Sequence, residues 1–282
     1  MERKRIAIVG VGLIGGSLAI QLHEKKIASR LIGVEASEDH ARKAVELELV
    51  DEVLPLEQAI AQSDVVVLAI PVDELVKQLP VVMSMIDEQI VLDMGSTKSQ
   101  LTELLKDHPK RGRYVATHPM WGTEYSGPQA AMRGAYENKA VILCNTSESD
   151  IDALEWTKAM YRKIGMHLLE MEAKAHDLHA AYVSHISHIT SFALANTVLG
   201  KEKEEQAIFE LASAGFESTV RLAKSNPAMW VPIFMQNREN VLDVLTEHIA
   251  QLTRFKESIE KEDKSSLTGL IEQANQIKRI LK

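Results

Sequence analysis

A histidine stands where a predicted strand ends, and its chemistry suits proton transfer. His118 follows a predicted strand at 114–116 and precedes Pro119, which restricts the backbone at this point. A neutral imidazole near pH 7 can accept a proton from an alcohol while hydride leaves the same carbon. The position therefore favours a general base at His118. The plainer alternative is a histidine that only hydrogen-bonds its own loop.

A serine follows a second predicted strand, 90–93, on the same edge of the sheet. Ser96 could bond a substrate hydroxyl or the histidine, and it or Thr97 could also cap the helix predicted from Lys98. Lys98 itself either adds positive charge at this edge or is a solvated lysine in the first helical turn.

Glycines at the start of the chain have the spacing of a phosphate-binding turn. Gly10, Gly12 and Gly15 follow the apolar run 6–9 and precede a predicted helix. In such a turn the first glycine allows a tight bend, the second lets a pyrophosphate approach, and the third lets helix and strand pack closely. With a strand before it and a helix after it, this spacing predicts dinucleotide binding. A glycine-rich turn without a ligand is the alternative.

A carboxylate follows the second apolar run, 31–34. Glu35 comes 25 residues after Gly10, where an acid that binds a ribose is expected. Its charge would repel a 2′-phosphate, so the sequence favours NAD over NADP. Arg42 lies nearby in the sequence and weakens that preference.

Several titratable residues crowd one predicted helix, namely His176, Asp177, His179, His185 and His188. Histidines three positions apart can bind a metal, but no further ligand set accompanies them, so we expect no metal site. Core and surface histidines are the plain interpretation. We expect His188, one turn from His185, to line a cleft between two domains.

Arg221 is the strongest candidate for binding an anion. It lies between two apolar residues, so a surface salt bridge is one interpretation. In a chain with a net charge of −8, it is also the best candidate for bidentate capture of a carboxylate. Trp230 lies near a predicted helix start, and we expect it in the core with one edge in a pocket.

The elements that position these residues differ between the two halves of the chain. The first half alternates apolar runs with helical patterns, which predicts an α/β fold with a mostly parallel, doubly wound sheet. Strands are predicted at 6–9, 31–34, 65–70, 90–93, 114–116, 140–143 and 167–170.

The second half is predicted to be helical. One helix runs from 173 to a stop at Gly200, and a second covers 204–212 before a break at Gly215. A third begins at Asn226 and Pro227 and continues past Phe255, and a last one, 267–281, is capped by Ser265 or Ser266. These long amphipathic helices predict a dimer interface. We place the domains at 1–171 and 172–282.

Composition excludes several classes of protein. The chain has 282 residues, 45% of them hydrophobic and 26% charged, as in an ordinary globular protein of two domains. A net charge of −8 argues against nucleic-acid or membrane-surface binding. A single cysteine, Cys144, excludes an internal disulfide and suits a reducing, cytoplasmic compartment. A strand begins almost at residue 1, so we expect no signal peptide.

Together the motifs resemble those of the prephenate dehydrogenase family over nearly the whole chain. The glycine-rich turn is shared by many dehydrogenases, whereas the other motifs, in this order, are specific to the family. The motifs lie at 10–17, 93–98, 118–127, 176–177, 184–188 and 221–230.

The resemblance implies a Rossmann-type domain followed by an all-α dimerisation domain. It implies NAD-dependent oxidative decarboxylation of prephenate to 4-hydroxyphenylpyruvate, a step of tyrosine biosynthesis. By motif position, His118 would accept the hydroxyl proton and Ser96 would orient hydroxyl, histidine and nicotinamide. Arg221 would bind a substrate carboxylate, and the pocket would be lined by His188, Thr123 and Trp230. The cofactor would lie on Gly10, Gly12, Leu13, Ile14, Gly15 and Glu35.

One residue departs from the family pattern, and three alternatives stay open. Trp121 stands where a small residue, usually alanine, is expected, so pocket shape or cofactor contact could differ. Arogenate dehydrogenase carries out the same reaction on the aminated substrate. A β-hydroxyacid dehydrogenase would need a glycine-rich turn before Lys174, which is missing. An NAD(H)-binding sensor without turnover would leave His118 and Arg221 idle.

Overall fold

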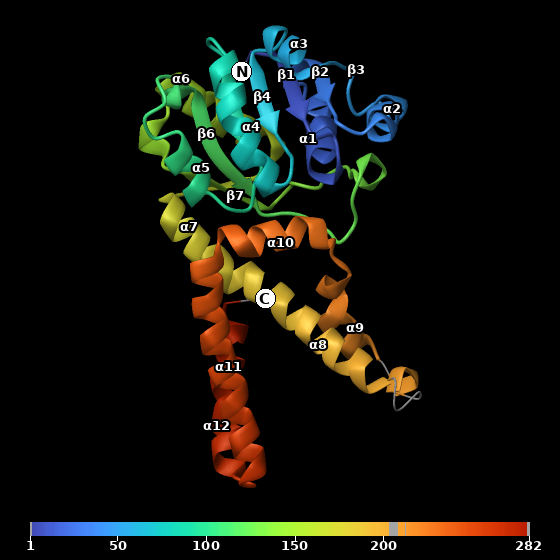
Figure 1. Cartoon of the computed structure of the whole chain (residues 1–282), viewed down its shortest axis with the longest axis vertical. Helices are drawn as coiled ribbons and strands as arrows, with labels where there is room; N and C mark the ends of the chain where they lie inside the picture. Colours follow the sequence, from blue (N-terminus) through green and yellow to red (C-terminus); the bar gives the residue numbers. More distant parts are fainter. Residues whose placement is uncertain (1, 203–207, 212, 281–282) are drawn as a thin grey trace. The chain divides into compact units, whose positions relative to one another are not determined.

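The computed structural model describes residues 2–202, 208–211 and 213–280 (Figure 1). By their contacts, the residues form two compact units, Met1–Asn237 and Arg238–Lys282. Each unit is described separately below.

The first unit is built on an eight-stranded sheet in the order β3-β2-β1-β4-β5-β6-β7-β8 (Figure 1). All neighbouring strands run parallel except β6 and β7, which are antiparallel. The α/β doubly wound fold predicted from the sequence is therefore confirmed. The strands are β1 (Lys4–Val9), β2 (Ala28–Val34), β3 (Glu52–Val53), β4 (Val65–Leu68), β5 (Ile90–Asp93), β6 (Tyr114–Pro119), β7 (Ala140–Cys144) and β8 (His167–Met171).

The central strands are apolar on both faces because both faces are covered by helices. In β4, Val65 and Val67 belong to one core, whereas Val66 and Leu68 belong to the other. The first core receives α1 (Leu13–Glu24), α2 (Glu38–Glu46) and α6 (Ile151–Ile164). The second receives α3 (Leu56–Ala61), α4 (Val72–Met85) and α5 (Ser99–Leu104).

Helix α1 packs close to β1 because three glycines shape the turn between them. Gly10 has a φ of +89°, a left-handed conformation that favours glycine. A Cβ atom at Gly15 would lie 2.1 Å from the Gly10 carbonyl oxygen, so helix and turn approach too closely for a side chain. Gly12, by contrast, has open space beside it.

Helices complete the first unit, and no strand follows β8 in the described part of the chain. They are α7 (Ala173–Ala180), a π-helical turn (Ala181–His185), α8 (Ile186–Glu202), a 3₁₀ turn (Ile208–Leu211), α9 (Ala214–Val220), a 3₁₀ turn (Arg221–Lys224) and α10 (Pro227–Gln236). Trp230 and Ile233 of α10 join the second core of the sheet. The predicted boundary between residues 171 and 172 marks where the strands end, although the compact unit continues to Asn237.

Two predicted helix breaks are wrong. Helix α8 continues through Gly200, and Gly215 lies inside α9, because neither glycine adopts a positive φ in the structure. The single helix predicted from 173 is instead interrupted by the π-helical turn. Most of the helix predicted at 204–212 lies outside the described residues.

The predicted helix caps hold only in part. Asn226 caps α10 as expected, since its side chain accepts from the Ala228 amide at 2.9 Å. Neither Ser96 nor Thr97 caps α5: its N-cap is Lys98, and the capping carboxylate comes from Asp177 on α7. Tertiary contacts, which are invisible to local sequence spacing, decide that cap.

The second unit pairs two helices, α11 (Arg238–Glu260) and α12 (Lys264–Ala274), before a 3₁₀ turn, Asn275–Arg279. Asp263 caps α12 by accepting from the Ser266 amide at 3.0 Å, so the predicted serine caps are wrong. Asn237 separates α10 from α11, which the sequence predicted as one helix. Within the residues that the structure describes, no helix is long and apolar enough to span a membrane.

Replacing Gly15 with alanine should destabilise the fold, because the new carbon would overlap the Gly10 carbonyl oxygen. Overpacking of this kind costs about 1–3 kcal/mol of unfolding free energy, which urea unfolding would measure. Gly12→Ala is the matched control, since a Cβ atom there meets nothing within 4 Å. Equal unfolding free energies for the two variants would contradict the role given to Gly15.

Candidate functional site

The glycine-rich turn presents an open helix terminus at the carboxyl edge of the sheet. The N-cap of α1 is Gly12, which has no side chain to cap the helix. A Cβ atom at Gly12 would meet no atom within 4 Å, so the space above the turn is free. Leu13 and Ile14 form the first helical residues, whose amides have no partner within the helix. This cradle fits a pyrophosphate, which such amides and the helix dipole favour.

Glu35 reaches this turn from the end of β2. Its Oε2 accepts from the Val11 amide at 3.1 Å, and its Oε1 accepts from the Ala36 amide at 3.0 Å. Arg42 pairs with Asp39 and Glu46 on its own helix. The charge that the structure places beside the turn is therefore the carboxylate of Glu35, and the guanidinium of Arg42 already has carboxylate partners.

At the end of β6, His118 begins a chain of hydrogen bonds that leads to a buried carboxylate. Its Nδ1 lies 2.8 Å from Nε2 of His176, and Nδ1 of His176 lies 2.8 Å from Oδ1 of Asp177. His176 and Asp177 are adjacent residues of α7, and both are buried. These hydrogen bonds therefore join the sheet to the helical part of the same unit.

The carboxylate fixes the tautomers of both rings. An ionised carboxylate only accepts hydrogen bonds, so His176 donates from Nδ1 and keeps a lone pair on Nε2. His118 then donates from Nδ1 to His176. The lone pair of a neutral His118 is therefore on Nε2, the ring nitrogen outside the chain. That atom can accept a proton.

Asp177 is held in its charged form by several donors. Burial alone would raise the pKa of this carboxyl, but hydrogen bonds from His176 and Ser99 outweigh it and hold the pKa below its usual value. Backbone amides of Lys98 and Ser99 each lie 2.8 Å from a carboxylate oxygen. Asp177 thus caps α5 and orients His176 at the same time.

A buried ion pair lies beneath the same edge. Lys98 is fully buried and its Nζ pairs with Asp93 at the end of β5, so the interpretation of Lys98 as a solvated lysine is wrong. Burial lowers the pKa of His118 well below its usual value, and electrostatic interactions with His176, Lys98 and His185 lower it further. His118 is therefore neutral near pH 7, as a proton acceptor must be.

Ser96 and Thr123 lie on the loops that follow β5 and β6. Because β5 and β6 are parallel neighbours, both loops leave the sheet at one edge. Ser96 is half-buried, and its hydroxyl can donate a hydrogen bond to a ligand or accept one from it. The Thr123 hydroxyl accepts from the Tyr125 amide at 3.3 Å.

The loop after β6 also meets Arg221. Nη1 of Arg221 lies 3.4 Å from Oε2 of Glu124, the residue after Thr123. The guanidinium is about half exposed, so its partner can exchange for another carboxylate. The surface salt bridge considered from the sequence exists, and it joins two predicted site segments.

His188 and Trp230 lie against each other in the helical part of the first unit. Their rings stack with centroids 3.4 Å apart, and His188 Nδ1 lies 3.1 Å from the Ser184 carbonyl. Burial lowers the pKa of His188. Helix α8, which carries His188, packs against the 3₁₀ turn that begins at Arg221. The indole nitrogen of Trp230 is buried without a partner in the described part of the chain. The structure thus groups Arg221, His188 and Trp230.

The sequence singled out His176, Asp177 and His185 but not Asn237, nor the contacts that link these groups. The Asn237 side chain donates to the Asp177 carbonyl at 2.7 Å and lies 3.2 Å from His185 Nδ1. His185 in turn meets the edge of Trp230, with centroids 6.0 Å apart. An adjacent His176–Asp177 pair on the buried side of a helix was the available signal, since such polar residues need partners.

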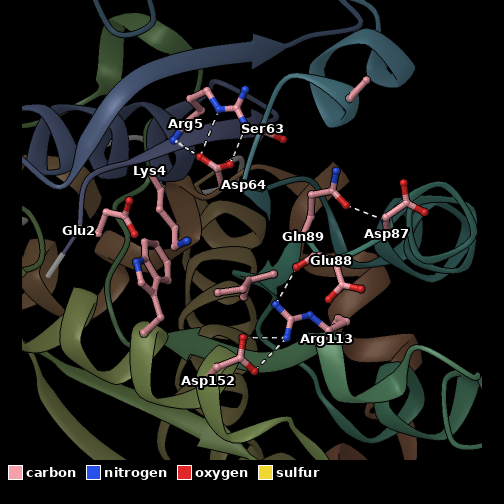
Figure 2. A pocket seen from close by; sticks show the side chains of 13 residues that line it. Glu2, Lys4, Arg5, Ser63, Asp64, Asp87, Glu88, Gln89, Arg113 and Asp152 are labelled. Atoms are coloured by element: carbon pink, nitrogen blue, oxygen red, sulfur yellow. Dashed lines mark hydrogen bonds and ion pairs between the residues drawn. The ribbon is translucent and has the colours of Figure 1, made fainter.

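A cavity of about 520 Å³ lies at the opposite, amino edge of the sheet (Figure 2). Figure 2 shows Arg5 paired with Asp64 and Arg113 paired with Asp152, so both guanidiniums are engaged. In open α/β sheets ligands bind at the carboxyl edge, and the chemistry-bearing residues gather there. The described residues contain no group of three or more His, Cys, Asp or Glu that could hold a metal ion.

Comparisons with known proteins identify the family. Residues 18–170 match the family model of the prephenate dehydrogenase nucleotide-binding domain, and residues 172–273 match that of the prephenate dehydrogenase dimerization domain. Prephenate dehydrogenase of Bacillus subtilis is 30% identical over 93% of this chain and 72% of that protein.

Two solved structures are also similar. Prephenate dehydrogenase of Aquifex aeolicus, in complex with hydroxyphenyl propionate and NAD⁺, has a TM-score of 0.88 and 30% identity over 99% of this chain and 98% of that one. Synechocystis arogenate dehydrogenase has a TM-score of 0.79 and 25% identity over 99% and 100% of the two chains. The chain therefore belongs to the prephenate dehydrogenase family of NAD-dependent oxidoreductases.

Proposed function

We propose that the protein catalyses the NAD-dependent oxidative decarboxylation of prephenate to 4-hydroxyphenylpyruvate, in the cytoplasm, as a step of tyrosine biosynthesis. The observation that carries the proposal is the hydrogen-bond chain from His118 through His176 to Asp177. It leaves a proton-accepting nitrogen at the edge where the glycine-rich turn also opens. Oxidation of an alcohol needs a base for the hydroxyl proton and a cofactor for the hydride, and both would lie at this edge.

His118 would accept the proton of the ring hydroxyl at Nε2. The resulting imidazolium would be stabilised through His176 by the charge of Asp177, as a buried carboxylate does for a catalytic histidine elsewhere. NAD⁺, when bound, supplies the hydride acceptor. Loss of CO₂ makes the product ring aromatic and provides driving force, so positioning is the main task of the protein.

Arg221 would bind a carboxylate of the substrate. Its present partner, Glu124, is a single contact at 3.4 Å, whereas a substrate carboxylate could bind both guanidinium nitrogens. His188, Trp230 and Thr123 would line the pocket, and the buried indole N–H of Trp230 is a donor without a partner in the described residues. Ser96 would hold the ring hydroxyl and His118 together.

NAD is the cofactor that the turn suits best. Gly10, Gly12 and Gly15 would shape the cradle, the amides of Leu13 and Ile14 would face the pyrophosphate, and Glu35 would bind the ribose hydroxyls. The carboxylate would repel a 2′-phosphate. Arg42 is paired with Asp39 and Glu46 and would have to leave them to accommodate one.

Arogenate is the second candidate substrate. It differs from prephenate by an ammonium in place of the keto oxygen, and a carboxylate near Arg221 could receive that ammonium. Glu124 occupies this position. A sensor without turnover has no support, because the family consists of oxidoreductases.

We further propose that the protein acts as a homodimer. On α11 the apolar residues Leu242, Ile249, Leu252 and Ile259 are 47%, 55%, 56% and 63% exposed. Their spacing of seven, three and seven places them on one helix face, as in a helix seam. Burying such a row against a second copy would remove apolar surface from water.

The proposal is tested by NADH formation at 340 nm with prephenate and with arogenate, each with NAD⁺ and NADP⁺. We expect turnover with prephenate and NAD⁺, and a kcat/KM at least about tenfold lower for the other pairs. A preference for arogenate would move the substrate assignment and leave the chemistry. An absence of turnover with both substrates would overturn the proposal.

His118→Asn should lower kcat by about 10²–10⁴ while NADH affinity stays within about twofold, because a general base contributes this much. His179→Asn, an exposed histidine of α7, is the matched control. In wild type, the acid limb of kcat/KM should fall below pH 6.5, since burial and nearby charges lower the pKa of His118. An acid limb that persists in His118→Asn would assign it to another group.

Arg221→Ala should raise the KM for prephenate by about 10–100-fold with a smaller change in kcat, because the lost contact is a charged hydrogen bond worth about 1.5–3 kcal/mol. Lys224→Ala removes the same charge from the other end of the same 3₁₀ turn and serves as the control. Similar KM values for the two variants would show that only general charge attraction is involved.

A further inference from the structure

The two residues that follow β6 enter opposite cores of the sheet. Met120 packs against the core that contains α4 and α10, and Trp121 packs against the core that contains α1 and α6. This arrangement fixes the backbone just after His118 from both faces. It also carries the indole of Trp121 toward the helix that follows the glycine-rich turn.

Trp121 meets Tyr136, and Tyr136 meets that helix. The two rings make an edge-to-face contact, with centroids 5.3 Å apart and planes at 63°. Tyr136 is fully buried, and its hydroxyl donates to the Ile14 carbonyl at 2.7 Å. Burial raises the pKa of Tyr136 well above its usual value, so the hydroxyl keeps its proton. Ile14 lies in the first turn of α1, at the cofactor cradle.

Neighbouring contacts hold the same segment along α1. The Met132 amide donates to the Ser17 hydroxyl at 2.9 Å. A Cβ atom at Gly16 would lie 3.0 Å from Cβ of Ala131, so the loop lies directly on the helix. Residues 131–136 therefore form a brace between the loop that follows His118 and the turn that would hold the pyrophosphate.

We propose that Trp121 is a positioning residue that sets the first turn of α1, and hence the cofactor, relative to His118. The alignment of the cofactor with His118 matters for catalysis only if the proposed function holds. The effect of Trp121 on cofactor binding depends only on the glycine-rich turn and α1. An aromatic ring is needed at 121 because it must reach Tyr136 across the core, and ring pairs in this geometry are mutually attractive.

NADH binding, measured by fluorescence titration without substrate, tests the brace. Trp121→Ala should raise the Kd of NADH about tenfold, and Tyr136→Phe, which keeps the ring but loses the bond to Ile14, about threefold. Trp121→Phe should stay within about twofold of wild type, because a ring still faces Tyr136. In turnover, the KM for NAD⁺ should rise more than the KM for the second substrate.

Trp156→Ala is the matched control, since this indole of α6 packs against the same core and lines the cavity at the amino edge of the sheet. It should lower the melting temperature while the Kd of NADH stays within about twofold. Equal weakening by Trp156→Ala and Trp121→Ala, or unchanged affinity in Trp121→Ala, would overturn the inference. If Trp121→Ala does not fold, unchanged affinity in Tyr136→Phe overturns it. If the wild-type protein turns over neither prephenate nor arogenate, but the variants change the Kd of NADH as expected, only the proposed function is refuted.

Discussion

The structure of the site depends on one buried negative charge, that of Asp177. Burying a carboxylate is costly unless donors surround it, and here the donors are two backbone amides of α5 and the ring of His176. The same group therefore caps a helix of the sheet domain and fixes the tautomer of His118. Removing it would leave an uncapped helix end and a histidine pair without a defined proton arrangement.

Lys98 connects Asp177 with a second buried carboxylate, because its backbone amide donates to Asp177 and its Nζ pairs with Asp93. Lys98 is buried with Asp93, and Asp93 also accepts from Tyr114 at 2.8 Å and from the Thr117 amide at 3.2 Å. The ends of β5 and β6 are thus tied together by a charged network. Lys98 and Asp93 offset each other's charge, and burial keeps the neighbouring His118 neutral by lowering its pKa.

Sequence reasoning succeeded where the signal is local. The glycines of the turn, the apolar strands and the Asn226 cap each follow from steric or hydrogen-bonding needs of a few consecutive residues. It failed where a distant residue decides the outcome, as at α5, where Asp177 replaces Ser96 or Thr97 as the cap. Gly200 and Gly215 misled for a related reason, since glycine permits a helix end but packing determines whether one occurs. The grouping of Arg221 with His188 required the folded chain, because these residues are far apart in the sequence and lie on different elements.

The reversed direction of β7 has a consequence for how this fold can vary. A parallel neighbour must be reached by crossing to the far edge, but β7 starts at the edge where β6 stops. The connection 120–139 therefore leaves from and returns to the same edge of the sheet. Its later residues pack along α1, where Tyr136 is fully buried and Glu137 pairs with Lys25 at the end of that helix. A substitution in this connection can therefore change the edge that carries His118 and the support of α1 together, so the topology couples these two parts of the molecule.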